Sequence, residues 1–193
     1  SIGLALIITD HHLVHEGEPL PEAVAIVHPA LPGTNYAWPE LSGSAVAWKL
    51  ARALVTVHQG RDDPVEPQSL VLRDTLCLAA MGVIADVMPL TGENRRIVAK
   101  GLRIMHTCGL PGVQAMLQTC LRQGESLESE TVAFRIGPRI NAAGRLGHAQ
   151  EALDILCTDD PDEARRLIDL GVDALITNDP QRLRRSLRSP EMP

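Results

Sequence analysis

Apolar and polar positions divide the chain into two short strands followed by a series of helices. Ile2–Ile8 is an almost unbroken apolar run that ends at a polar cluster, which is typical of a strand buried on both faces of a parallel sheet. Ala23–Val27 is typical of a second strand. Later apolar residues recur at helical spacing, with Ser42 or Ser44 as the N-cap of the first helix. We expect helices over Ala45–Val57, Leu70–Ile84, Glu93–Met105, Pro111–Leu121, Ala149–Cys157 and Pro161–Leu170, and a strand over Val172–Thr177.

This pattern predicts an α/β fold with a parallel sheet. A parallel strand needs neighbours and none precedes the first strand here, so we expect that an N-terminal part of the domain lies outside this chain. No stretch approaches the ~20 apolar residues that span a bilayer, and the first apolar run lacks the basic start of a signal peptide. We therefore expect a cytoplasmic protein with no membrane association.

Composition and charge narrow the classes of function that this protein can have. With 45% hydrophobic and 22% charged residues in a chain of 193, the protein is globular. A net charge of −6 argues against a protein that coats nucleic acid, although a local basic site is compatible with it. The four cysteines have no C-x-x-C spacing, which favours reduced, buried thiols over a zinc site. Nearly all positive charge is arginine, because Lys49 and Lys100 are the only lysines.

Two polar features are candidates for metal chemistry. Asp10, His11 and His12 follow the first strand directly, at the sheet edge where α/β proteins bind ligands. Imidazole is a common ligand of divalent metals, yet three polar residues after a strand are also typical of an ordinary turn. Asp86 is a single carboxylate after fifteen mostly apolar residues, and it is either a solvated helix end or a metal ligand.

A third candidate is the segment from Gly137 to Arg145. Its glycines permit close approach of the backbone to a ligand, and its arginines and asparagine supply donors for phosphate. It matches neither a dinucleotide-binding fingerprint nor a P-loop. The alternative is a tight connection between helices that arginines cap.

Taken in order, these motifs resemble the DHH phosphoesterases, and among them the RecJ-like single-stranded-DNA exonucleases. The resemblance rests on Asp10-His11-His12, on His28-Pro29, on Leu41–Ala51, on Gly82–Arg95 and on Gly137–Arg145, which is similar to the signature of the DHHA1 domain. It covers roughly residues 1–170. From about residue 171 the chain departs from the pattern and resembles the closing strand of a glycerophosphodiester phosphodiesterase barrel.

The resemblance implies a two-manganese site, with magnesium as an alternative ion, that hydrolyses phosphodiester bonds of single-stranded DNA from 5′ to 3′ in repair and recombination. His11 and Asp86 would ligate metal. His12 would contact the scissile phosphate and Asp10 would support the histidines. The phosphates of the substrate would be held by Arg139, Asn141, Gly144 and Arg145.

The resemblance also implies a division into domains. Residues 1–108 would be the C-terminal part of a DHH domain, with a connecting helix near 92–107, and residues 109–193 part of a DHHA1-like domain with an atypical tail. The family's Asp-x-Asp motif and a further aspartate lie upstream of the Asp-His-His strand, so we expect this chain to be weakly active or inactive. Two alternatives stay open: a phosphodiesterase for short oligonucleotides or cyclic dinucleotides, and a non-catalytic phosphate-binding remnant. The oligomeric state is open as well.

Overall fold

The two predicted strands form a small parallel sheet. The computed structural model describes residues 5–15, 17, 19–61, 70–140 and 149–169. Strand β1 (Ile7–Thr9) pairs in parallel with β2 (Ala25–Val27), and Ile8 lies opposite Ile26. Both strands overlap the predicted ranges, and their parallel pairing confirms the predicted α/β class.

The helices predicted from periodicity are present with nearly the expected bounds. They are α1 (Gly43–His58), α2 (Leu70–Ala85), α3 (Gly92–Met105), α4 (Pro111–Cys120), α7 (Ala149–Cys157) and α8 (Pro161–Asp169). The side chain of Ser42 caps α1 by accepting a hydrogen bond from the amide of Ala45 at 3.2 Å, as predicted. No helix in the described ranges is long and apolar enough to cross a membrane.

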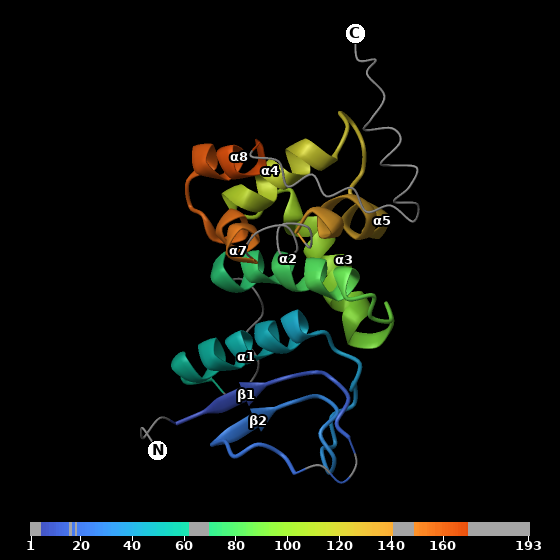
Figure 1. The fold of residues 1–193 in the computed structure, drawn as a ribbon, viewed down its shortest axis with the longest axis vertical. Coiled ribbons are helices and arrows are strands. Elements are labelled where there is room, and N and C mark those ends of the chain that lie inside the picture. The colour runs from blue at the N-terminus through green and yellow to red at the C-terminus, as the bar shows by residue number, and fades with distance from the viewer. Residues whose placement is uncertain (1–4, 16, 18, 62–69, 141–148, 170–193) are drawn as a thin grey trace, which may run out of the picture.

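The elements stack in layers on one side of the sheet. Figure 1 shows α1 above the strands, α2 and α3 beyond α1, and α4, α7 and α8 at the far end. Helix α2 is the centre of this stack, because it contacts α1, α3 and the helical segment around residue 134. The end of α2, and with it the carboxylate of Asp86, therefore lies toward the sheet.

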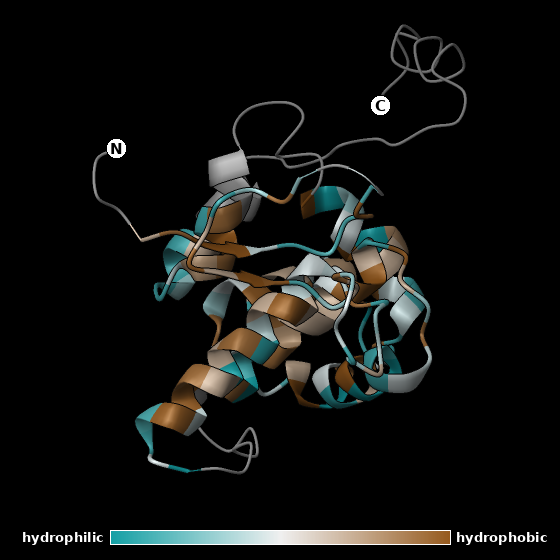
Figure 2. Ribbon diagram, turned by 90° about the horizontal axis from the view of Figure 1, so that it is seen from below, coloured by the Kyte–Doolittle hydropathy of each residue, from teal (hydrophilic) through white to brown (hydrophobic). Residues whose placement is uncertain are grey.

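The prediction that the first strand is buried on both faces is wrong for this chain. Leu6 and Ile7 are 52% and 58% exposed, and Val24 beside β2 is 73% exposed. Within the described residues the sheet has two strands, with α1 packed against β1 on one side. Figure 2 views the molecule from the side of the sheet and shows hydrophobic residues along the strands.

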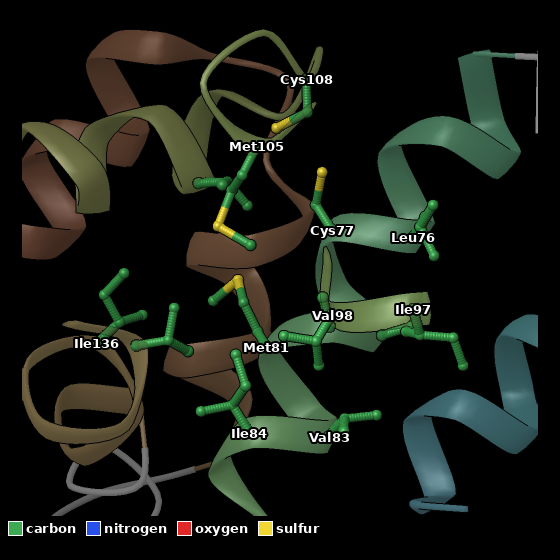
Figure 3. Close-up of a cluster of buried hydrophobic side chains, with 14 of the residues drawn as sticks. Leu76, Cys77, Met81, Val83, Ile84, Ile97, Val98, Met105, Cys108 and Ile136 are labelled. Carbon is green, nitrogen blue, oxygen red and sulfur yellow. The ribbon is translucent and has the colours of Figure 1, made fainter. Parts of the chain in front are cut away.

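A single hydrophobic core connects the helices and extends from Leu41 to Ile155. In Figure 3, side chains of α2 such as Leu76 and Met81 meet Ile97 and Val98 of α3. Cys77, Cys108 and Cys120 are buried free thiols, which confirms the expectation for them. Cys157 is exposed, contrary to the expectation, because it is the last residue of α7 and points away from the core.

The segment before residue 141 is helical, although no helix was predicted there. A short turn of helix, α5 (Ser129–Thr131), leads into a π-helix, η1 (Val132–Ile136), and residues 137–140 continue as helix. Val132 and Ile136 anchor this segment in the core, and Ala133 and Ile140 pack against the same core. Asn141, Gly144 and Arg145, the expected strand over 172–177 and the tail lie outside the described residues.

Candidate active site

The three residues after β1 form a turn that Asp10 organises. One carboxylate oxygen of Asp10 accepts hydrogen bonds from the amides of His11 (2.7 Å) and His12 (3.2 Å). The same oxygen lies 2.6 Å from Nδ1 of His12. Since an ionised carboxylate only accepts, His12 donates Nδ1–H and its Nε2 is left for another partner. The His12 side chain is 80% exposed, so that partner can come from solvent.

These hydrogen bonds set the charge of the turn. The hydrogen bond from the His12 ring, followed by those from the two backbone amides, lowers the pKa of Asp10 to about 2. Asp10 is therefore a carboxylate at any physiological pH. All three of these hydrogen bonds go to Oδ1 of Asp10, which thereby holds the two histidines in one turn.

His28, at the end of β2, fixes the same turn from the other side. Its Nδ1 accepts a hydrogen bond from the amide of Ala30 at 3.0 Å, so its Nε2–H donates to the carbonyl of His12 at 2.8 Å. His28 is buried. In the sequence, His28 belongs to the RecJ-like pattern as part of His28-Pro29, but its role in holding the turn was not predicted. The rule that selected His11, a polar residue at the carboxyl edge of a parallel strand, also applies to His28.

His11 points inward and meets Asp86. Nδ1 of His11 lies 3.7 Å from Oδ2 of Asp86, and their side chains are 18% and 47% exposed. The rings of His11 and His12 are also neighbours, with centroids 4.5 Å apart. The structure thus brings together His11 and Asp86, the two residues expected to ligate metal, although they are 75 positions apart in the chain.

The start of α1 provides the space for the His11 ring. A Cβ added to Gly43 would lie 3.1 Å from Cδ2 and 3.4 Å from Nε2 of His11, so a larger residue at position 43 would press on the imidazole. The same end of α1 is locked to α2, because Ser44 Oγ donates to the carbonyl of Ala79 at 3.2 Å. Gly82 permits this approach, since a Cβ there would lie 2.1 Å from Ser44 Oγ.

Asp86 occupies an electrostatically unfavourable position at the end of α2. The amide of Met88 donates to the carbonyl of Val83 and the amide of Val87 to that of Ile84, which is the hydrogen-bond pattern of a Schellman motif. Asp86 is the C-cap in this motif, where the helix dipole disfavours negative charge, and no basic residue lies in the last turn of α2. A cation near the carboxylate would remove this penalty.

Val87, next to Asp86, is strained. Its φ of 55° lies in the left-handed region, which a β-branched residue rarely adopts and which this motif normally fills with glycine. Val87 is 87% exposed, so no packing of its side chain holds it there. The hydrogen bonds that end α2 impose the conformation, and they fix the direction in which Asp86 leaves the helix.

The segment around Gly137 lies close to Asp86 through its neighbour Ala85. A Cβ added to Gly137 would be 3.5 Å from the Cβ of Ala85 and 3.2 Å from the carbonyl oxygen of Val132. An apolar cavity of about 230 Å³ separates α2 from the π-helix at this point. Arg139 donates to the carbonyl of Arg135 at 2.8 Å, which is a helix-internal contact. The structure therefore places the first part of the glycine–arginine motif beside the end of α2.

His11 and Asp86 fit part of a divalent-metal site. Their facing atoms are too far apart for a hydrogen bond, yet close enough for both to bind one ion at about 2.1 Å. Imidazole and carboxylate suit manganese as well as zinc or iron. In the described part of the chain no three His, Cys, Asp or Glu side chains gather as metal ligands, so these two donors stand without a third protein donor there.

Comparison with known proteins shows which proteins this chain is related to. Relatives named single-stranded-DNA-specific exonuclease RecJ match from Bacillus subtilis (strain 168), at 39% identity over 167 residues, and from Escherichia coli (strain K12), at 38% over 170. Each match covers 86% of this chain. This chain is homologous to part of RecJ. It spans 19% of the length of the first RecJ and 29% of the second. No protein-family model matches the sequence.

Solved RecJ structures share the fold. The manganese complex of RecJ from Thermus thermophilus has a TM-score of 0.73 at 37% identity, covering 88% of this chain and 24% of that chain. Another exonuclease RecJ bound to manganese has a TM-score of 0.70 at 39% identity, covering 87% of this chain and 39% of that chain. The predicted resemblance to RecJ is thereby confirmed, as is the mixed α/β class with its small parallel sheet.

Proposed function

We propose that this chain is part of a RecJ-type exonuclease that hydrolyses phosphodiester bonds of single-stranded DNA with the help of a divalent metal. The observation that carries the proposal is the 3.7 Å approach of His11 to Asp86, at the place where the RecJ-like motifs come together. The names of the homologues favour single-stranded DNA over short oligonucleotides or cyclic dinucleotides as the substrate. Cleavage from 5′ to 3′, a role in DNA repair and recombination and a cytoplasmic location belong to the same proposal.

In this proposal each side chain of the cluster has one task. His11 and Asp86 would hold manganese, or magnesium in its place, and the ion would supply positive charge that polarises phosphate and acidifies water. Asp10 keeps Nδ1 of His12 protonated, so that Nε2 of His12 can contact the scissile phosphate. His28 positions the His12 backbone through the hydrogen bond to its carbonyl. Arg139 and, beyond the described residues, Asn141, Gly144 and Arg145 hold other phosphates of the strand.

The proposed division into domains follows the same homology. Residues 1–108 supply the histidines and Asp86 as the C-terminal part of a DHH domain. Residues 109–193 supply the glycine–arginine segment as part of a DHHA1-like domain. The contact of Gly137 with Ala85 supports this arrangement, because it brings the second part of the chain to within one residue of Asp86.

Manganese binding to the chain is the direct test. With His11 and Asp86 as its donors, we expect weak binding, since manganese prefers about six oxygen or nitrogen ligands. Electron paramagnetic resonance of free Mn²⁺ should show binding that His11→Ala and Asp86→Asn each abolish. The matched control His58→Ala, on the exposed last turn of α1, should leave binding unchanged. Equal binding by all four proteins would overturn the assignment of the ligands.

Activity is tested in parallel on three substrates with added Mn²⁺. We expect release of nucleotides from single-stranded DNA above that from dinucleotides and cyclic dinucleotides, and loss of this release in His11→Ala. Preference for a dinucleotide would support the phosphodiesterase alternative. Metal-dependent binding without hydrolysis of any substrate would support the non-catalytic alternative for this chain.

A further inference from the structure

A second concentration of charge lies in a cavity between α1, α2 and α3, away from the histidines. The cavity has a volume of about 260 Å³. Its apolar wall is formed by the buried side chains of Trp48, Leu76 and Ile97. The remaining wall consists of charged side chains from α1 and α3: Lys49, Arg52, Glu93, Arg96 and Lys100.

The sign of this cavity is opposite to that of the chain. Among the described residues, four cationic side chains and one carboxylate line it, whereas the whole chain carries a net charge of −6. Both lysines of the sequence, Lys49 and Lys100, contribute to it although they are 51 positions apart. A concave surface with this charge attracts anions, because its low-dielectric walls focus the field.

The single carboxylate is already engaged. Lys49 Nζ donates to both carboxylate oxygens of Glu93, at 3.0 and 2.7 Å, and the hydroxyl of Tyr36 donates to the same group. Burial opposes ionisation of Glu93, but these hydrogen bonds outweigh it and hold its pKa below its usual range. Glu93 is therefore engaged with Lys49, and Arg52, Arg96 and Lys100 are the other charged side chains that line the cavity among the described residues.

The neighbouring side chains hold two of the cations in place. The indole Nε1 of Trp48 donates to the carbonyl of Leu72 at 3.0 Å, which fixes the ring. The Arg52 guanidinium lies 5.8 Å from the centre of this ring, and Lys49 Nζ lies 5.0 Å from that of Tyr36. Little conformational entropy is then lost when these two groups meet a ligand.

The cavity is separate from the His11–Asp86 pair. Gly43, which touches His11, begins α1, and Lys49 and Arg52 follow it on the same helix. At a rise of about 1.5 Å per residue they lie roughly 9 and 14 Å farther along α1. A ligand that fills the cavity therefore does not use the same groups as one bound between the histidines and Asp86.

We propose that this cavity is a subsite for phosphate groups. Arginine and lysine together provide planar and point-charge donors that suit phosphate oxygens. The phosphates come either from the backbone of a nucleic-acid strand or from a free polyphosphate. Binding of a strand here rests on the proposed exonuclease function, whereas binding of a free polyphosphate does not.

Two matched double variants test the subsite. Arg96→Ala with Lys100→Ala removes two cations of the cavity from α3, and Arg95→Ala with Arg103→Ala removes two exposed cations from the same helix outside the cavity. Binding of tripolyphosphate and of a fluorescent oligothymidylate is measured in EDTA, so that a metal at His11 takes no part. We expect the cavity variant to bind roughly tenfold more weakly and the control to change little.

The salt dependence identifies the source of the phosphate. If a strand occupies the cavity, the slope of log K against log salt for the oligothymidylate should fall by about 1.4 in the cavity variant alone. A loss restricted to tripolyphosphate assigns the cavity to a free polyphosphate. Equal losses in both double variants, or none in either, would overturn the subsite.

Further variants make the test of the phosphate subsite decisive. Glu93→Gln should strengthen tripolyphosphate binding several-fold by removing the negative charge of Glu93, and weaker binding in a variant with unchanged circular dichroism would contradict the subsite. If a double variant does not fold, the single changes Arg96→Gln and Arg103→Gln give the same comparison. Phosphate binding that depends on Arg96, in a chain whose Mn²⁺ binding is unchanged by His11→Ala and Asp86→Asn, would retain the subsite and overturn the proposed metal site.

Discussion

The helical core and the histidine cluster are held together by different forces. Around α2 and α3, Leu76, Val83 and Met105 are at most 1% exposed, and the helices touch so closely that a Cβ on Gly101 would lie 2.3 Å from that of Ala80. Many apolar contacts share the stabilisation there. Around His11, in contrast, a few hydrogen bonds within one turn and one close glycine fix side chains that remain accessible.

This difference separates stability from chemistry. Loss of side-chain volume from the core strongly changes the free energy of unfolding. The histidine cluster contributes little to that free energy. The cluster instead contains groups in unfavourable positions, such as Asp86 at the negative end of a helix and Val87 in the left-handed region. Such positions persist because the packed helices behind them determine where the chain must run.

The largest effect is expected in the core. Leu76→Ala should lower the free energy of unfolding by about 2–5 kcal/mol, because Leu76 is 1% exposed and its removal leaves a cavity beside α3. Urea denaturation measures the change. The matched control Leu54→Ala, at a position that is 62% exposed on α1, should change it by less than about 0.5 kcal/mol. Similar losses in the two variants would remove the contrast between core and surface.

The junction between the two regions should be nearly as sensitive. Gly82→Ala should cost about 1–3 kcal/mol, because the new methyl group would lie 2.1 Å from Ser44 Oγ and push α1 away from α2. It should also weaken Mn²⁺ binding, since the start of α1 seats His11. Adding Ser44→Gly, which removes the clashing atoms, should recover both properties in part. A stable Gly82→Ala that binds Mn²⁺ normally would show that this contact does not couple them.

Beside the cluster, a substitution should stabilise the protein. Val87→Gly should raise the free energy of unfolding by up to about 1 kcal/mol, because glycine adopts the left-handed conformation without the steric cost that valine bears. Thermal denaturation at two or more pH values shows whether the substitution stabilises or destabilises the protein. Val71→Gly, at an exposed position in α2, should instead destabilise by about 0.5 kcal/mol. A destabilised Val87→Gly would mean that Val87 is not strained.

The smallest effect concerns the turn itself. The pKa of Asp10 falls from 3.8 to about 2 on folding, so its carboxylate stabilises the turn above about pH 4 and this contribution disappears as the pH falls through 2. The amide chemical shifts of His11 and His12 should titrate with a midpoint near pH 2. Glu125 also has a pKa near 2, so Asp10→Asn is the necessary control and should abolish the titration at both amides. A midpoint near the ordinary value of 3.8 in the parent chain would exclude these hydrogen bonds.

Much of the architecture could be predicted because it follows local rules. The apolar period predicted the bounds of α1, α2, α3 and α4 within about two residues, and Ser42 signalled the start of α1. The helix over residues 129–140 was not predicted, because η1 winds with a π-helical period and only two of its residues are buried. Val132, Ile136 and Ile140 do face the core, but the exposed Phe134 and the Gly137-Pro138 pair between them obscure that face in the sequence.

Part of the candidate site could likewise be predicted from the sequence, and part of it could not. The residue types and order at Asp10, His11 and His12 could be interpreted from the sequence, because a polar cluster after a parallel strand lies at a ligand-binding edge whatever the rest of the fold. That Asp86 approaches His11, that Gly43 gives room for the imidazole and that His28 holds the turn depend on how α1 packs on α2 and on the strands. Packing also joined the lysines of α1 and α3 around one cavity. The sequence determined which groups are available, whereas only the tertiary structure decided which of them meet, because contacts between distant residues depend on the packing of whole helices rather than on local preference.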